Sequence, residues 1–541
     1  MEPNQLFYGD NLDVLQRHVK DESIDLVYLD PPFKSNQDYN VLFAEHGTRS
    51  TAQIKAFEDT WRWDEVAAAA YEETVESGGE VAQAMRAFRT LIGTSDMLAY
   101  LSMMAPRLVE LRRVLKPTGS LYLHCDPAAS HYLKLLLDAI FGPTRFRNEI
   151  IWKRTSSHSS SKKYAPIHDT ILYYGKSESA SWNSPRVDYE EEYLDRYYKY
   201  DDGDGRLHWR ADLCAAGTRK GSSGQPWRGF DPAVKGMHWK FKVERLDELD
   251  AEGRIYWPPG GTGWPQYKRY REELKGKVIP DIWDDINRIN PVGGERLGYP
   301  TQKPQALLER IIQASTHEGD TVLDPFCGCG TTIAAAQRLR RRWIGIDITH
   351  LAINLIRHRL RDAYGNDITK DYRVIGEPVT ADEAGELAKE DPYQFQWWAL
   401  GLVGARPTEQ KKGADKGIDG RIYFHDEGPG GKTKQIILSV KAGSTSVPHL
   451  RDLRGVMERE NAEIGVLITM KGPTQPMRTE AASAGYFTSP GWQTKHPRLQ
   501  ILTVEELLDG KQIDYPHVTG VTFKKAPKAK PNELEPEPLF E

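Results

Sequence analysis

Cysteine is scarce in this sequence, with four residues in a chain of 541. So few cysteines in so long a chain cannot build a disulfide framework, which excludes the class of secreted scaffolds held together by disulfides. Cys327 and Cys329 also lack the second pair of ligands that a structural zinc site needs at close spacing. We therefore expect a protein of a reducing compartment, the cytoplasm.

Long apolar runs are missing as well. No stretch of about 18 apolar residues occurs, so no membrane-spanning helix and no membrane partner is expected. The first residues, MEPNQLFYGD, lack a basic segment followed by an apolar one, so no secretory signal is expected either. An excess of positive charge is absent too, since the net charge is −5. This value neither favours nor excludes DNA as a partner, because phosphate contacts are local.

The chain does contain an alternation of strand and helix patterns, and its length predicts two to four domains. Residues 5–33 have the pattern of strand, helix, strand. Helical spacing over 96–116 ends at Lys-Pro-Thr-Gly, and a strand pattern follows at 121–124. After an interruption, the expected elements are a helix at 305–315, a strand at 321–323, a helix at 331–339 and a strand at 343–346. This order favours an α/β fold with a mostly parallel sheet.

Two other regions differ from this pattern. Residues 155–295 contain polar, basic, Gly/Ser-rich stretches and many aromatics, which indicates an irregular insert. A second α/β unit begins near residue 376, with strands expected at 421–424, 435–440 and 464–468. The Pro- and charge-rich tail, 516–541, is expected to be disordered.

A glycine loop joins the expected strand at 321–323 to the helix that begins near Thr331. Gly328 and Gly330 allow a tight turn and a close backbone approach, and the helix N-terminus attracts an anion. Asp324 would repel a pyrophosphate but suits a ligand that carries both an ammonium group and a carboxylate. Asp347, 23 residues after Asp324, suits a ribose diol. An ordinary strand–turn–helix remains an open alternative for this segment taken alone.

A second loop, Asp30-Pro31-Pro32-Phe33, follows a buried strand pattern near the N-terminus. Its two prolines stiffen the turn. A carboxylate from Asp30 and the carbonyl of Pro31 suit an amine of low nucleophilicity, because they accept its hydrogens and stabilise the positive charge that develops on it. Phe33 offers a face on which a flipped base can stack. A plain Pro-Pro turn is the alternative for this loop in isolation.

Taken together, the two loops resemble those of the DNA amino-methyltransferases, in the order that is typical of their β-group. Tyr8-Gly9-Asp10, the segment 115–120, the segment 148–154 and Tyr299-Pro300-Thr301-Gln302-Lys303-Pro304 are similar to further segments of that family. The resemblance covers about residues 5–155 and 295–365. It implies a Rossmann-like, S-adenosylmethionine-dependent methyltransferase fold in circularly permuted order.

The resemblance also implies roles for single residues. Catalysis falls to Asp30, Pro31, Pro32 and Phe33. S-adenosylmethionine would be bound by Asp10, Lys303, Asp324, Phe326, Gly328, Gly330 and Asp347. The implied domains are a methyltransferase at 1–155 and 295–375, a target-recognition insert at 156–294 and a further domain at 376–515.

The implied reaction is methylation of a flipped base in double-stranded DNA, with adenine N6 preferred as the methyl acceptor. Cytosine N4 remains open, as does a DNA-binding protein that keeps the cofactor fold without catalysis. The insert supplies cations for phosphates and aromatics for stacking, although a solvated surface with some core tryptophans is the better explanation of any one of them. A homodimer is left open.

The unit after residue 376 resembles an Mrr-like restriction endonuclease domain. Asp419 precedes one expected strand and Lys441 ends the next, which is the pattern for Mg²⁺ held by Asp419 beside a lysine that orients water. The position that is usually acidic or Gln is Ser439, a weak Mg²⁺ ligand. Asp415 or Glu458 would have to complete such a site. An active nuclease, a DNA-holding module and an ordinary surface pair therefore remain three open interpretations.

Overall fold

The computed structural model describes residues 3–32, 39–42, 53–57, 63–156, 164–261, 263–290, 295–297, 299, 301–408, 417–426, 433–516 and 519–520. Two compact units emerge: residues 1–183 with 281–536 form unit 1, and residues 184–280 form unit 2. Unit 1 contains two large sheets, each with its own hydrophobic core. No helix in the described ranges is both long enough and apolar enough to cross a membrane.

The larger sheet of unit 1 has the strand order β15-β6-β7-β5-β2-β16-β17-β1-β18. Its strands are β1 (Asn4–Tyr8), β2 (Ile24–Leu29), β5 (Leu115–Cys125), β6 (Phe146–Lys153), β7 (His168–Gly175), β15 (Ile282–Trp283), β16 (Thr321–Asp324), β17 (Arg342–Asp347) and β18 (Tyr372–Ile375). From β5 to β18 all neighbours are parallel, whereas β7 runs antiparallel to β5 and β6. The expected α/β fold with a mostly parallel sheet is confirmed.

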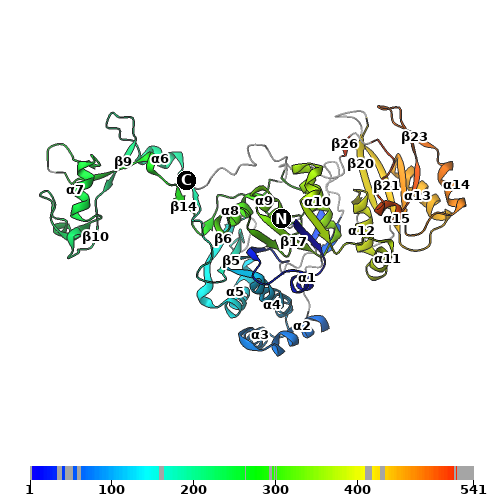
Figure 1. Cartoon of the computed structure of the whole chain (residues 1–541), viewed down its shortest axis with the longest axis horizontal. Coiled ribbons are helices and arrows are strands. Elements are labelled where there is room, and N and C mark those ends of the chain that lie inside the picture. Colours follow the sequence, from blue (N-terminus) through cyan, green and yellow to red (C-terminus); the bar gives the residue numbers. More distant parts are fainter. Residues whose placement is uncertain are drawn as a thin grey trace. The chain divides into compact units, whose positions relative to one another are not determined.

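Helices cover both faces of this sheet (Figure 1). One face carries α1 (Asn11–His18), α4 (Asp96–Val114) and α5 (Pro127–Phe141), with α2 (Glu65–Glu76) and α3 (Gly79–Ile92) packed against them. The other face carries α8 (Gln305–Ser315), α9 (Thr331–Arg338) and α10 (His350–Tyr364). Every residue of β2 is buried, as expected for a central strand between two helical layers. The helix expected from residue 96 ends at Val114, just before Lys-Pro-Thr-Gly.

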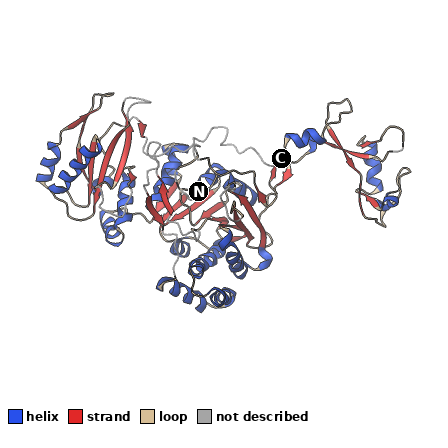
Figure 2. Ribbon diagram, turned by 180° about the vertical axis from the view of Figure 1, so that it is seen from behind, coloured by secondary structure: helices blue, strands red, loops and turns tan. Residues whose placement is uncertain are grey.

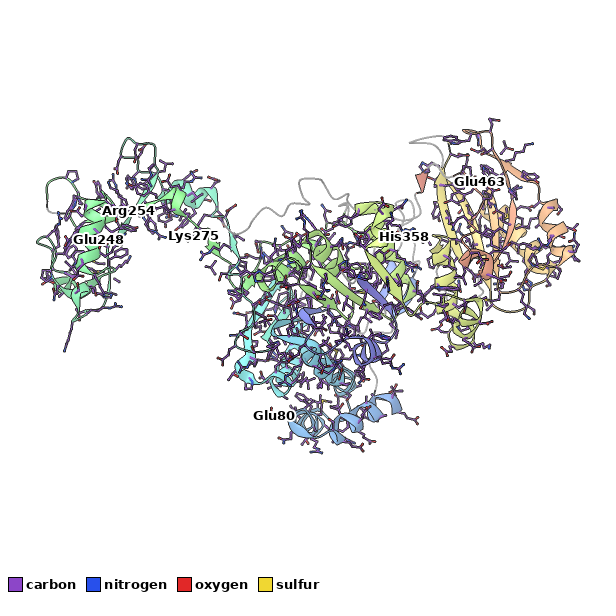
Figure 3. All side chains as sticks on the ribbon, in the orientation of Figure 1. Glu80, Glu248, Arg254, Lys275, His358 and Glu463 are labelled. Carbon is purple, nitrogen blue, oxygen red and sulfur yellow. The ribbon has the colours of Figure 1, made fainter. Side chains whose placement is uncertain are left out.

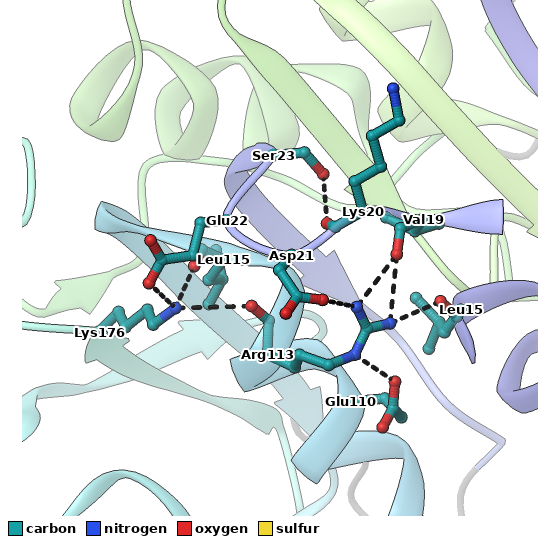
Figure 4. Close-up of polar contacts among 10 residues, drawn as sticks. All are labelled: Leu15, Val19, Lys20, Asp21, Glu22, Ser23, Glu110, Arg113, Leu115 and Lys176. Atoms are coloured by element: carbon teal, nitrogen blue, oxygen red, sulfur yellow. Dashed lines mark hydrogen bonds and ion pairs between the residues drawn. The ribbon is translucent and has the colours of Figure 1, made fainter. Parts of the chain in front are cut away.

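The turn before β2 is fixed by a single arginine near the end of α4 (Figure 4). Arg113 donates to the carbonyl oxygens of Leu15 at 2.7 Å and Val19 at 3.2 Å, and it pairs with Asp21. The last carbonyls of a helix have no partner within it, so these bonds satisfy the end of α1. They also fix the start of β2, and therefore the level in the sheet at which that strand ends.

Unit 2 has a small core of its own. A three-stranded antiparallel sheet is formed by β9 (His208–Asp212), β12 (Ile255–Tyr256) and β13 (Gln266–Tyr270), beside the β10 (Cys214–Ala216) and β11 (Met237–Trp239) pair. Trp227, Trp239 and Leu246 of α7 (Val243–Ala251) are buried together in this core. Glu248 lies on α7, and Arg254 follows shortly after its end (Figure 3). Tryptophans therefore build the interior here.

The insert expected at 156–294 is longer than unit 2, which is a correction to its boundaries. Residues 168–175 form β7 and residues 282–283 form β15, and both strands belong to the larger sheet of unit 1. The polar stretches at 156–163 and 217–229 suggest one continuous irregular region. However, the chain returns to the larger sheet between them, because the apolar residues of β7 form an antiparallel strand between β5 and β6.

The second sheet of unit 1 lies in the C-terminal part of the chain, with the order β19-β20-β21-β22-β25 (Figure 2). Its strands are β19 (Arg406–Pro407), β20 (Gly420–His425), β21 (Lys434–Lys441), β22 (Ile464–Thr469) and β25 (Leu499–Thr503), and β26 (Thr519–Gly520) also pairs with β20. The associated helices are α11 (Ala381–Glu390), α12 (Pro392–Leu402), α13 (Val447–Glu460), α14 (Gln475–Ser483) and α15 (Val504–Leu508). Two apolar clusters lie against this sheet. The three strands expected here are confirmed.

Candidate active site

Four acidic residues lie at one edge of the larger sheet because their strands are parallel neighbours. Val27 pairs with Leu323, so β2 and β16 end together, with Asp30 just after one and Asp324 closing the other. On the other side of β16, β17 ends at Asp347, and its neighbour β1 leads directly to Asp10. The two loops, which are distant in the sequence, therefore meet at neighbouring strand ends.

Asp30 forms an ion pair with Lys303 at this edge. Both side chains are largely buried, with 16% and 11% of their surfaces exposed. The resemblance had assigned Lys303 to the cofactor, whereas the structure places its ammonium group on the carboxylate of the Asp-Pro-Pro loop. Pro31 is buried beside it. Phe33 lies outside the described residues.

Asp324 is a buried carboxylate, with 3% of the residue exposed. It accepts a hydrogen bond from the main-chain N–H of Phe326 at 3.0 Å. Burial raises the pKa of Asp324 to about 7, and the negative charges of Asp30 and Asp347 add to this rise. No arginine or lysine of the described ranges forms an ion pair with it. Such a carboxylate suits a ligand that brings its own positive charge.

Asp347 is held by the loops on both sides of it. Its carboxylate accepts from the N–H of Gly328 at 2.9 Å, and from the N–H and hydroxyl of Thr349 at 2.9 and 2.8 Å. Burial raises the pKa of Asp347 to about 6, although these hydrogen bonds oppose the rise. The ring of Phe326 is partly buried against the core. The glycine loop is thus tied to the end of β17.

Asp10 is engaged on both carboxylate oxygens. One accepts from the N–H of Leu12 at 2.8 Å and caps α1, and the other pairs with Arg107 at 2.7 Å. Arg107 also donates to Asn11, whose amide donates to the carbonyl of Pro325 at 2.8 Å. Sequence reasoning missed Arg107 and Asn11. They join the Asp10 segment to the cofactor loop through contacts that no local pattern indicates.

A second missed feature lies beside Asp347. The ring of Tyr8 stacks on His350, with 3.6 Å between the ring centroids and 19° between the planes. His350 in turn contacts Glu377 at 3.4 Å. Tyr8 belongs to Tyr8-Gly9-Asp10, a segment that the sequence relates to the family only by resemblance. The stacked pair forms a planar wall at the end of β1.

Gly328 and Gly330 adopt the left-handed conformation, with φ of +49° and +72°. Gly330 precedes α9, and a Cβ at this position would lie 2.7 Å from Cγ1 of Ile356 on α10. The loop therefore requires glycine there both for its conformation and for the close approach of α10.

Replacing Gly330 by alanine is expected to weaken cofactor binding by about 30-fold, since left-handed strain and a forced shift of Ile356 each cost on the order of 1 kcal/mol. Isothermal titration with S-adenosylmethionine measures this effect. Gly319 provides the matched control, because it has φ of +86° but open space at its Cβ position. Equal losses in the two variants would contradict a specific role for the loop.

In the C-terminal domain, Asp419, Ser439 and Lys441 are brought together. The Asp419 carboxylate accepts from the N–H of Val440 at 2.6 Å, the hydroxyl of Ser439 at 3.1 Å and the ammonium group of Lys441 at 3.5 Å. In the described part of the chain, no cluster of three His, Cys, Asp or Glu residues could hold a metal ion. Asp415 lies outside the described residues, and Glu458 faces Arg454 at 3.7 Å. The donor set present does not fit Mg²⁺.

Comparisons with known proteins match two regions of the chain. The family model N6_N4_Mtase, described as DNA methylase, matches residues 24–358, and a model described as NACHT-associated inactive Restriction Endonuclease 1 matches residues 393–509. The chain is 32% identical over 372 residues to the Type II methyltransferase M.EcaI of Enterobacter cloacae, covering 68% of this chain and 72% of the relative. It is 27% identical over 354 residues to the StyLTI Mod subunit of a Type III restriction-modification enzyme from Salmonella typhimurium, covering 62% of this chain and 50% of that protein.

Among solved structures, the chain is similar to the PvuII DNA methyltransferase (cytosine-N4-specific), with 14% identity, a TM-score of 0.34 and coverage of 68% of this chain and 91% of that one. The restriction-endonuclease-like character expected of the C-terminal domain is confirmed by its family model. The methylase model covers more than half of the chain and contains Asp30, Lys303, Asp324 and Asp347. This protein belongs to the N6/N4 DNA methylase family.

Proposed function

We propose that this chain transfers a methyl group from S-adenosylmethionine to N6 of an adenine flipped out of double-stranded DNA, as the modification enzyme of a restriction–modification system. One observation carries the proposal: Asp30 and Asp324 stand at the ends of adjacent parallel strands, at the same edge of the sheet. A carboxylate for the acceptor amine thereby lies beside a carboxylate for a cationic cofactor.

The residues present fit S-adenosylmethionine. Asp324 would face its ammonium group, the glycine loop would receive its carboxylate, and Asp347 would hold its ribose. Tyr8 and His350 form a flat wall at the adjacent strand end that suits an adenine ring. When bound, the cofactor supplies an electrophilic methyl group on a sulfonium centre.

The acceptor side is proposed to work through Asp30 and the carbonyl of Pro31. They accept the two amine hydrogens and direct the nitrogen lone pair toward the methyl group. When the methyl group is transferred, the cofactor would keep the electron pair of the broken S–C bond, and Asp30 with the Pro31 carbonyl would stabilise the positive charge that develops on the amine. The surplus amine proton leaves afterwards. Lys303 holds the carboxylate of Asp30 in place, which supports a positioning role for this lysine rather than a cofactor contact alone.

The test is methylation of unmodified DNA with labelled cofactor, followed by enzymatic digestion to nucleosides. N6-methyldeoxyadenosine is the expected product. N4-methyldeoxycytidine would establish the cytosine alternative, which this family also covers. Absence of label from the wild-type protein would favour a DNA-binding protein without catalysis. Sequencing the modified bases would identify the target site.

We further propose that the C-terminal domain holds DNA without cutting it. The support comes from Asp419. Its carboxylate accepts hydrogen bonds from Ser439 and from the main chain of β21, at the position where a nuclease presents acidic metal ligands. Lys441 remains partly exposed, with 36% of its side chain accessible, and suits a phosphate.

Incubation of unmethylated DNA with the protein and Mg²⁺ is therefore expected to leave the DNA intact. Lys441→Ala should lower the slope of log affinity against log salt by about 1, the effect of losing one phosphate contact. Lys389→Ala, which removes an exposed lysine from α11, provides the control. DNA cutting that Lys441→Ala abolishes would establish an active nuclease instead.

A further inference from the structure

A chain of buried polar groups runs behind the catalytic edge, on the sheet face that carries α8. The hydroxyl of Tyr28 lies 2.9 Å from Nδ1 of His124, and Nε2 of His124 lies 3.2 Å from the carboxylate of Asp169. The other oxygen of Asp169 lies 3.2 Å from Nε of Arg154. Tyr28, His124 and Asp169 have 2%, 0% and 2% of their surfaces exposed. Polar groups buried this deeply impose specific partners and orientations on one another.

The partners of His124 determine which of its nitrogens carries the proton. Burial alone would raise the pKa of Asp169, but the hydrogen bond from His124 and the positive charges of Lys303 and Arg154 hold this pKa below its ordinary value. Asp169 is therefore a carboxylate and can only accept. Burial lowers the pKa of His124, and the positive charge of Lys303 adds to this effect, which favours the neutral form of the ring. Nε2–H thus donates to Asp169, and Nδ1 must accept the proton of the Tyr28 hydroxyl.

Tyr28 stands at a position that matters for methyl transfer. Tyr28 lies on β2, two residues before Asp30 in the sequence. Its neighbour Val27 pairs with Leu323 of β16, the residue before Asp324. Burial raises the pKa of Tyr28, and the negative charges of Asp30 and Asp324 add to this rise. Because its proton is given to His124, the phenolic oxygen is left with lone pairs alone.

We propose that His124 and Asp169 are positioning residues that act through Tyr28: they turn its O–H proton away from the catalytic edge, so that the Tyr28 oxygen faces the positive charge developing on the methylated amine. An oxygen fixed in this orientation stabilises that charge without reorganising during the reaction. This inference rests on the catalytic role proposed for Asp30. It adds a third acceptor, from β2 itself, to Asp30 and the Pro31 carbonyl.

Tyr28→Phe keeps the buried ring and removes only the hydroxyl. We expect the single-turnover methylation rate to fall by about 10- to 100-fold, the usual effect of losing an orienting partner, with no change in cofactor affinity. Tyr122→Phe is the matched control. Tyr122 lies on the neighbouring strand β5 and is buried, and its hydroxyl lies 2.7 Å from that of Ser315, outside this chain of groups. Its methylation rate should equal that of the wild type.

Asp169→Asn tests the direction of the hydrogen bonds. An asparagine amide can donate to Nε2 of His124, which forces the proton onto Nδ1 and makes the Tyr28 oxygen an acceptor of that proton. The rate should fall about as far as in Tyr28→Phe, on the order of 10- to 100-fold. The double variant should lose no more than either single one, because both changes disable the same oxygen.

A wild-type rate in Tyr28→Phe would overturn the proposal, as would losses that multiply in the double variant. A merely structural role predicts a lower melting temperature with an unchanged rate per folded molecule. If Asp169→Asn does not fold, the Tyr28→Phe and Tyr122→Phe pair still decides. The Asp30→Ala variant distinguishes a failure of this inference from a failure of the proposed function. An inactive Asp30→Ala beside a fully active Tyr28→Phe rejects this inference alone, whereas an active Asp30→Ala rejects the proposed function.

Discussion

Asp30→Asn is expected to lower the single-turnover methylation rate by about 10³-fold while leaving the affinity for S-adenosylmethionine nearly unchanged. Asparagine keeps the shape of the side chain but removes the negative charge that stabilises a positively charged amine. It also leaves the buried Lys303 without its charged partner in the Asp-Pro-Pro loop. Positive charge would then face positive charge at the moment of transfer.

The same strand offers a matched control at its other end. Asp25 is buried on β2 and forms an ion pair with Lys116 at 2.7 Å, far from the catalytic edge. Asp25→Asn should lower the melting temperature but not the rate per folded molecule. Rapid mixing with excess enzyme and labelled cofactor gives the rates, and isothermal titration gives the affinities. Equal rate losses in both variants would mean that Asp30 acts through folding rather than through chemistry.

Cofactor affinity is expected to rise with pH between about 5.5 and 8. Asp324, with a pKa of about 7, and Asp347, with a pKa of about 6, are partly protonated in this range before the cofactor binds. A cationic ligand favours the ionised form of Asp324, so binding must release a proton at low pH. Affinity should therefore fall as pH drops below about 7, by at most about tenfold per unit for each group.

Asp324→Asn should weaken binding by about 100-fold at pH 8, or about 2.7 kcal/mol, since it removes the charge that faces the ammonium group. The pH dependence near 7 should disappear, and only the step near 6 should remain. Asp320→Asn is the control, because Asp320 lies at the opposite end of β16 and caps a turn by accepting from the N–H of His317 at 2.7 Å. An affinity that is independent of pH in the wild type would contradict this account.

The raised pKa values of Asp324 and Asp347 also make folding stability depend on pH in the absence of cofactor. A carboxyl group whose pKa is raised in the folded state binds its proton more tightly there than in the unfolded chain. Its contribution to stability is fully present below the unfolded pKa of about 3.9 and is lost as pH rises through the folded value. Asp324 therefore lowers the free energy of unfolding as pH rises toward about 7. Bound cofactor should reverse this trend, because it supplies the missing positive charge.

The sequence by itself determined the local elements and the chemical character of both loops. Strand, glycine loop and helix around Asp324 depend on residues within a few positions of one another, as does the stiff turn after Asp30. The alternation of strands and helices also indicated a mostly parallel sheet, although the tertiary structure decided that β2 and β16 are neighbours in it. These features could be predicted because their causes lie in backbone conformation and in apolar spacing over short segments.

Only the tertiary structure decided which polar partner each of these residues takes. Lys303 meets Asp30 across 273 positions of sequence, and Tyr28 meets His124 across 96. The Asp419 carboxylate likewise accepts hydrogen bonds from Ser439 and from the main chain of β21, and no spacing of residues indicated these bonds. Such contacts arise when separate strands pair and their side chains are buried together. Burial makes each polar group find a partner, and the sheet, not the local sequence, brings that partner within reach.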